Sequence, residues 1–478
     1  MRTGTPVASP NVFAYLMLAV WPVVTFVLFT RVDAARALIW TLLAGYLLLP
    51  PIATFNLPVV PDMDKYSIPS LAALALAVVV RRDRVSVVPE GWLGRVLMGL
   101  FVLSPFATVL TNGDPVFIQA GNLPGQRIYD SVAAVANQGI ALVPFFLARR
   151  YLATPAAMQA IVVALVAAGL AYSVPMLLEA RLSPQMNVWV YGFFQHDFFQ
   201  TIRFGGYRPV VFLPHGLWVA FSALMCVLAA VALLREGPAA VRPRLLAAAM
   251  YLALVLVICK SAGALIYALG LIPVILLFGR RWQVMLAAGL AVIVVAYPLL
   301  RGAHLVPLDG IVQFASGLDA DRGYSLQFRV NNEEQLLARA AERPWFGWGG
   351  YGRNLILDPV TGKILTIADG AWIIALGIYG WLGYVAQFGL LALPLVLLGR
   401  EAWVSKSAVF SPFACAVALI FAANMVDLLP NATLIPFTWA MGGALLGYAE
   451  ALARDRRAGR EAAVRAGLHG GRRRRTVI

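Results

Sequence analysis

The chain has 478 residues, of which 61% are hydrophobic and only 13% are charged, whereas soluble domains contain about 25% charged residues. Its mean hydropathy is +0.78, and apolar runs of about 18 residues or more recur along it, each long enough to cross a bilayer. This composition excludes a soluble globular protein. The sequence also lacks the alternating segments of about ten residues that are typical of a membrane β-barrel.

The net charge of +15 has its main source in the arginines of short loops and of the chain end. In a soluble protein such a charge would indicate nucleic acid as a partner. In a membrane protein it marks the cytoplasmic loops, so we expect the lipid bilayer and no nucleic acid. Residues 453–478, which contain RDRRAGREAAVRAG and GRRRR, are predicted to be a basic cytoplasmic tail beside anionic lipid.

The predicted spans form one transmembrane domain, residues 1–452, of the all-α class: a polytopic helix bundle of about 12–13 spans. The number of spans is given as a range because the third segment is short and because Lys260 divides one long apolar run. In chain order the segments are Val12–Thr30, Ala37–Phe55, Ser67–Val80, Gly91–Leu110, Ser131–Ala148, Pro155–Leu178, Val210–Leu234, Leu245–Cys259, Gly263–Gly279, Gln283–Leu300, Ala371–Gly399, Ala408–Met425 and Leu434–Leu452.

The arginine-rich short loops, RVDAAR, RRDR and REGPAAVRPR among them, all fall on one side of this arrangement. The positive-inside rule makes that side cytoplasmic. The two long loops, residues 179–209 and 301–370, then lie on the opposite, periplasmic side, and the C-terminus is cytoplasmic. We therefore expect any reaction site to be built from these two loops and the span ends beside them.

The first long loop ends in RFGGYRPVVFLPHG, which places Arg203 and Arg208 at the mouth of a span. The guanidinium group is planar and permanently charged, which suits phosphate oxygens, and it is costly beside hydrocarbon without a partner or a function. The alternative is an ordinary loop arginine that reaches the interface. His215 is expected about two turns into the span, as a candidate site residue or a packing residue, and His196 as a plain loop residue.

Lys260 interrupts an apolar run of about 35 residues. If the run forms two spans, Lys260 lies at the outer surface on the same side as Arg208. There it either neutralises a diphosphate or reaches for lipid headgroups.

The second long loop contains SLQFRVNNEEQLLARAAERPWFGWGGYGRN. We predict a short amphipathic helix that is capped by Asn331 or Asn332 and stopped by Pro344, with Arg329 just before it. Trp345, Phe346, Trp348 and Tyr351 fit a membrane interface. The glycines between them allow sharp turns or a close approach to a ligand.

Asp369 precedes the next span, in TIADGAW. It is a candidate to accept a proton from a hydroxyl group, and the alternative is a helix N-cap; the two roles are compatible. Asp427 is expected at the same face, more simply as a turn residue. No His, Asp, Glu or Cys spacing predicts a metal site, and no cofactor is expected.

Four motifs follow one another: R-x-G-G-x-R-P-x-x-F-x-x-H-G, K-S-x-G-A-L, S-L-Q-x-R with A-x-x-R-P-x-x-G-W-G, and D-G-x-W with L-G-x-x-G-x-x-G. Their order, spacing and shared side resemble the O-antigen ligase and O-antigen polymerase superfamily of bacterial cell-envelope enzymes. The resemblance covers residues 179–383.

The resemblance implies a metal-independent glycosyltransferase of the bacterial inner membrane. The donor would be a glycan on undecaprenyl diphosphate, used at the periplasmic face, and the acceptor would be a second glycan. Arginines of the family hold the diphosphate; the matching positions are Arg208, Arg203 and Arg329. Ligases commonly carry an arginine after a serine at a further site, where this chain has Ser261 followed by alanine and Lys260 as the nearest cation.

Ligases also tend to carry a histidine where this sequence has Asp369. This difference favours a polymerase of O-antigen or exopolysaccharide repeat units, with Asp369 and Arg329 as catalytic residues. The alternatives are a ligase that transfers the glycan to lipid A-core or protein, and a flippase for lipid-linked glycans. A separate chain-length regulator is a further candidate partner.

Overall fold

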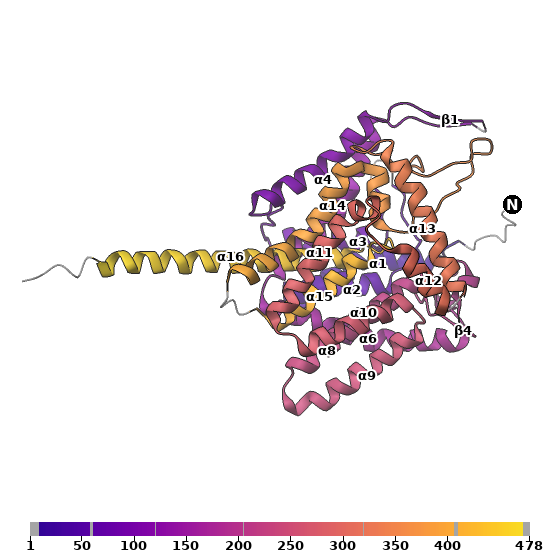
Figure 1. The fold of residues 1–478 in the computed structure, drawn as a ribbon. Helices are drawn as coiled ribbons and strands as arrows, with labels where there is room; N and C mark the ends of the chain where they lie inside the picture. Colours follow the sequence, from indigo (N-terminus) through magenta and orange to yellow (C-terminus); the bar gives the residue numbers. More distant parts are fainter. Residues whose placement is uncertain are drawn as a thin grey trace, which may run out of the picture.

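The computed structural model describes residues 9–57, 61–119, 121–203, 205–318, 320–405 and 410–471, without the side chains of residues 318–322 and 460–471. Within these residues the protein is a helix bundle with two short β-hairpins (Figure 1). The predicted fold class, an all-α polytopic bundle, is therefore confirmed. The final residues of the predicted tail, 472–478, lie outside the described residues.

Every apolar segment predicted from the sequence contains a helix. Eight helices of the described residues are long and apolar enough to cross a membrane, and four further apolar helices, α2, α3, α10 and α15, are shorter. The bounds are α1 (Val12–Arg31), α2 (Ala34–Leu48), α3 (Ser67–Val79), α4 (Trp92–Leu110), α5 (Ile128–Tyr151), α6 (Pro155–Leu182), α8 (Gly216–Glu236), α9 (Arg242–Ile258), α10 (Ala262–Leu277), α11 (Arg280–Gly302), α14 (Ala371–Val404), α15 (Pro412–Asp427) and α16 (Pro436–Gly471).

The centre of the bundle is formed by α8 and α15, whose side chains are buried on nearly every side. α8 packs against α6, α9, α10 and α15, while α15 also contacts α11 and α16. Both helices are rich in alanine, a small residue that allows the close approach of neighbouring helices. The outer helices, such as α1 and α9, expose large apolar side chains, as expected of lipid-facing spans.

The two long predicted loops contain more regular structure than expected. The first holds α7 (Met186–Tyr191), η1 (Phe198–Thr201) and the hairpin of β3 (Ile202–Arg203) and β4 (Gly206–Tyr207). The second holds α12 (Leu308–Leu318) and α13 (Ala320–Ala341). A further hairpin, β1 (Val116–Ile118) and β2 (Gly121–Leu123), connects α4 to α5, and η2 (Ala239–Val241) precedes α9.

The prediction of one short helix in the second loop was wrong in its length and in its start. α13 begins well before Asn331, so Arg329 lies on the helix rather than ahead of it. Asn332 is not a cap: it is buried inside α13, where its side chain donates to the Phe328 carbonyl and accepts from the Ile367 N–H. The predicted end is confirmed, because α13 stops at Ala341, before Pro344.

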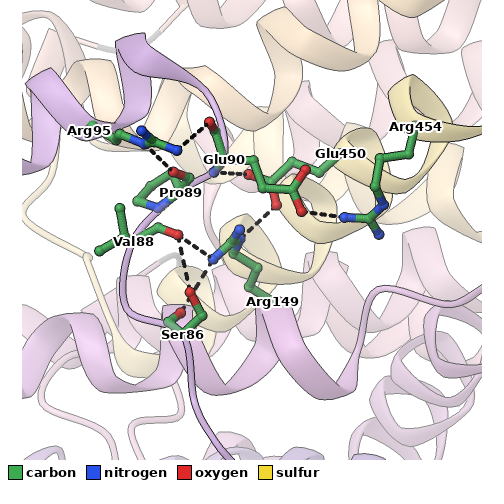
Figure 2. Close-up of polar contacts among 8 residues, drawn as sticks. All are labelled: Ser86, Val88, Pro89, Glu90, Arg95, Arg149, Glu450 and Arg454. Atoms are coloured by element: carbon green, nitrogen blue, oxygen red, sulfur yellow. Dashed lines mark hydrogen bonds and ion pairs between the residues drawn. The ribbon is translucent and has the colours of Figure 1, made fainter. Parts of the chain in front are cut away.

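The elements of the two long loops and the β1–β2 hairpin lie at one end of the bundle, whereas α16 projects from the opposite end (Figure 1). At that opposite end Glu450 of α16 accepts from Arg149 Nε at 2.7 Å and from the Glu90 N–H at 2.9 Å, as Figure 2 shows. Arg149 also donates to the Val88 carbonyl, and Arg454 pairs with Glu90. This network ties the loop before α4 to the end of α5 and to the middle of α16.

Candidate functional site

Arg208 lies at the end of the first long loop, five residues after Arg203 of β3, and its side chain is only 5% exposed. It crosses the N-terminus of α8: a Cβ on Gly216 would lie 2.5 Å from Arg208 Cδ. Among the described residues no carboxylate pairs with it, and its Nε has no hydrogen-bond partner. A buried arginine in this state is costly unless it serves a ligand.

Other cations act on Arg208. Burial is the main reason that the pKa of Arg208 is lowered to about 10, and the charges of Arg203 and Arg329 contribute in the same direction. The group still remains charged at neutral pH. Three guanidinium groups from β3, the α8 entrance and α13 therefore share one positively charged region, which is the arrangement that an anion of high charge density requires.

Lys260 occupies the tight turn that divides α9 from α10, with a φ of 53°, so the predicted division of the apolar run is confirmed. Its Nζ donates to the Arg203 carbonyl at 2.7 Å and lies over Gly206, where a Cβ would be 2.7 Å away. Lys260 thus supports the β3–β4 hairpin. It has two further N–H donors on the same ammonium group.

His215 was expected inside a helix, but it is the N-cap residue of α8. The expectation failed because residues 210–214 are not helical. His215 Nδ1 accepts from the Leu217 N–H at 2.9 Å, so the ring proton is on Nε2. Burial, followed by His196 and Arg208, lowers the pKa of His215 to about 3, so the ring is a neutral donor. His196, expected as a plain loop residue, stacks edge-on with it at 4.3 Å between ring centroids.

Asp369 pairs with Arg329, with Oδ2 lying 3.4 Å from Arg329 Nε, and both side chains are about one-third exposed. The alternative that Asp369 caps α14 is not what the structure shows, because Gly370 is the N-cap residue and no side chain caps this end. Asp427, expected as a turn residue, is instead the last residue of α15, and its carboxylate accepts from Asn431 and Thr433 in the turn that follows.

Glu333 and Arg301 were not singled out from the sequence. Glu333 lies one turn after Arg329 on α13, and burial raises its pKa to about 7, with the nearby Arg301 acting in the opposite direction. Arg301, at the end of α11, is 6% exposed and lies 3.9 Å from Glu334. The i, i+4 spacing of Arg329 and Glu333 is the one signal in the sequence that relates Glu333 to the site.

The irregular segment of residues 209–214 connects Arg208 to His215 and is buried, so its backbone groups need partners. Glu179 Oε2 accepts from the N–H groups of Val210 and Val211, both at 2.7 Å. Val211 has a φ of 51°, a strained conformation for a β-branched residue. Such strain persists only where the surrounding structure holds it in place, so the neighbouring side chains must fix the conformation of this segment.

Three further side chains complete this support. Gln195 donates to the carbonyls of Val211 and Leu213, and Tyr172 accepts from the Phe212 N–H at 3.1 Å. Lys65, only 1% exposed, donates to the Phe212 carbonyl at 2.9 Å. Burial lowers the pKa of Lys65 to about 7. The sequence contained no local signal for these supports, because they come from distant elements.

The structure therefore brings together Arg203, Arg208, His215, Arg329 and Asp369, while Lys260 supports them through a backbone contact. The combination of three guanidinium groups, a neutral imidazole donor and a carboxylate can bind a diphosphate and accept a proton beside it. Among the described residues no three His, Cys, Asp or Glu side chains group as metal ligands do.

Comparison with models of known protein families gives no match to this chain, and comparison with curated proteins gives none either.

Proposed function

We propose that this protein polymerises undecaprenyl-diphosphate-linked oligosaccharide repeat units by glycosyl transfer at the periplasmic face of the bacterial inner membrane. The observation that supports this most directly is the convergence of Arg203, Arg208 and Arg329 with Asp369 at one end of the bundle. The motif order that resembles the O-antigen ligase and polymerase superfamily supports it independently.

In the proposed reaction an acceptor hydroxyl oxygen attacks the anomeric carbon of the donor sugar. The bond from that carbon to the diphosphate oxygen breaks, and its electron pair leaves with the lipid diphosphate. Arg208, Arg203 and the neutral His215 donate to the diphosphate and stabilise its growing negative charge. Asp369 accepts the hydroxyl proton, and Arg329, which contacts Asp369, orients the carboxylate between acceptor and leaving group.

The test is polysaccharide profiling in a strain that lacks the protein and is complemented with wild type, Arg208→Lys or Asp369→Asn. Arg181→Ala and Asp309→Asn, which change exposed residues at the same end of the molecule, are matched controls. Membrane levels of every variant are measured first. We expect wild type and controls to restore long chains, and both site variants to accumulate single lipid-linked units.

Other results identify the alternatives. Polymer that forms but stays on its carrier lipid would indicate a ligase. Lipid-linked units that remain inaccessible to a membrane-impermeant reagent added outside would indicate a flippase. Site variants that match wild type would show that these residues are not the reaction site.

A further inference from the structure

Two polar cavities meet at Asn137 of α5, which lines both of them. One, of about 400 Å³, lies between α3, α5 and α16, and its lining includes Asp64, Tyr66 and Trp439. The other, of about 240 Å³, lies between α4, α5, α14 and the glycine-rich segment after α13, and its lining includes Gln138. Both lie along the N-terminal part of α5, and we call the two cavities together the α5 groove.

The α5 groove contains buried polar atoms that lack partners among the described residues. Gln138, which is 8% exposed, lines the smaller cavity, and its buried Oε1 has no hydrogen-bond partner. Gln126 Oε1 in the same cavity and Tyr66 Oη in the larger one are in the same state. Unpaired buried polar groups cost free energy, and a cluster of them in one groove indicates a ligand that supplies the missing hydrogen bonds.

The chemistry of the lining identifies the class of ligand. Among the described residues, no lysine or arginine lines either cavity, whereas Asp62, Asp64 and Asp130 do. Phosphates and acidic groups are therefore disfavoured. Amide and carboxylate groups beside aromatic rings, here Tyr66 and Trp439, suit a ligand with many hydroxyl groups and an apolar ring face, which is the chemistry of a saccharide.

The glycine-rich motif belongs to this groove. Gly349 and Gly350 line the smaller cavity, and Gly349 has a φ of 77°, which favours glycine. A Cβ on Gly349 would lie 2.2 Å from the Gln126 amide, whereas a Cβ on Gly350 would meet nothing within 4 Å. The motif thus brings backbone close to the α5 groove, and Gly350 is a position from which a larger side chain can enter it.

Residues next to the larger cavity of the α5 groove contact the surroundings of the cationic site. Tyr66 follows Lys65, whose Nζ bonds the Phe212 carbonyl between Arg208 and His215. On the other wall, Leu434 follows Thr433, which donates to Asp427. Adjacent residues in the chain therefore connect the α5 groove to the cationic site. The two regions differ in charge.

We propose that the α5 groove is a saccharide-binding site that takes an uncharged or amino-bearing oligosaccharide and excludes acidic sugars. This proposal rests on the proposed function in one respect: in the polymerase the bound saccharide is the glycan of the acceptor. Binding of a lipid-free saccharide can nevertheless be measured without turnover.

The experiment uses the full-length protein in lipid nanodiscs and calorimetric titration with two probes. One is the pool of short, lipid-free oligosaccharides released by mild acid from the surface polysaccharide of the source bacterium; the other is inorganic diphosphate. The groove variants are Gln138→Leu and Gly350→Leu. The control is Gly139→Leu, which changes the exposed neighbour of Gln138, at a position where a Cβ meets nothing within 4 Å.

We expect saturable saccharide binding by wild type, weakened about tenfold or more by each groove variant and unchanged in Gly139→Leu. Diphosphate binding should be retained by the groove variants, which shows that they are folded, and weakened by Arg208→Lys, which should retain saccharide binding. Absence of saturable saccharide binding by wild type, or wild-type affinity in both groove variants, would overturn the proposal.

The two proposals fail separately. If wild type binds saccharide through the α5 groove but the deletion strain makes normal polymer, the groove stands and the polymerase function fails. If polymer requires Asp369 but the groove variants bind saccharide normally, the function stands and the groove fails.

Discussion

Arg329 of α13 and Asp369, just before α14, form an ion pair with 3.4 Å between Nε and Oδ2. The contact joins the helix of the second long loop to the entrance of a buried helix. Since both side chains are about one-third exposed, the pair contributes little to stability, on the order of 0–1 kcal/mol for exposed pairs. Its significance in the proposed reaction is the orientation of a carboxylate beside guanidinium groups.

The first prediction concerns this pair. Asp369→Asn should lower polymer formation by about 100-fold or more, because a positioned general base contributes at least that much, while the unfolding temperature should stay near that of wild type. Polymer yield and thermal unfolding are measured on the same preparations. Glu342→Gln is the control, because Glu342 pairs with Arg339 on the same helix at 2.6 Å. A variant Asp369→Asn with wild-type yield would contradict the assigned role.

The second prediction concerns Glu179, which is 2% exposed and accepts three backbone N–H groups, those of Val210, Val211 and Met186. Glu179→Gln replaces one acceptor oxygen by an NH₂ group that faces donors. We expect a loss of about 1–3 kcal/mol of stability and weaker binding of inorganic diphosphate, because the strained segment next to Arg208 is released.

The control for this prediction is Arg181→Gln, an exposed change near the end of the same helix. Denaturation midpoints and diphosphate titrations decide the outcome. If Glu179→Gln lost stability but kept wild-type diphosphate affinity, Glu179 would support the fold alone and not the position of Arg208.

The third prediction concerns stability and pH. Burial lowers the pKa of Lys65 from 10.5 to about 7, so between these values the unfolded chain binds a proton that the folded chain does not. The free energy of unfolding contributed by this group therefore rises with pH from about 7 to 10.5. Lys65→Met should remove that rise, whereas Lys363→Met, at an exposed loop position, should keep it. Unfolding midpoints measured across this pH range test the prediction; equal slopes for wild type and Lys65→Met would refute it.

The fourth prediction concerns activity and pH. Burial raises the pKa of Glu333 to about 7, so its side chain gains a negative charge as the pH rises through that value. The new charge competes with Asp369 for Arg329 and repels the negatively charged diphosphate, so polymer formation should fall above pH 7. Glu333→Gln should flatten this fall. Glu334→Gln, which changes the exposed neighbour, should not. Initial rates in membranes from pH 6 to 9 distinguish these outcomes, and an unchanged profile in Glu333→Gln would exclude Glu333 as the cause.

Composition and periodicity alone were sufficient to predict the helical bundle, since each apolar segment from Val12 to Leu452 contains a helix. The division at Lys260 and the end of α13 before Pro344 were also predicted. These features depend on local properties: the length of hydrocarbon that a segment can cross, the cost of a charge within it, and the backbone restrictions of proline.

The arginines of the candidate site were also recognisable from the sequence, because a guanidinium group at the mouth of a span stands out against apolar surroundings. What the sequence did not determine is what surrounds them. The non-helical conformation of residues 209–214, just before α8, depends on side chains that come from other elements: Glu179, Gln195, Tyr172 and Lys65. For the same reason His215 was placed inside a helix when it caps one.

The tertiary structure alone decided the partner of Asp369, the half-buried state of Glu333 and the α5 groove. Each of these depends on contacts between elements far apart in the chain, such as Gly349 against Gln126. Residue identity determines which charges and hydrogen-bonding groups a chain carries. Packing determines which of these groups are left without partners in the folded protein, and those unpaired groups are the ones that a ligand can bind.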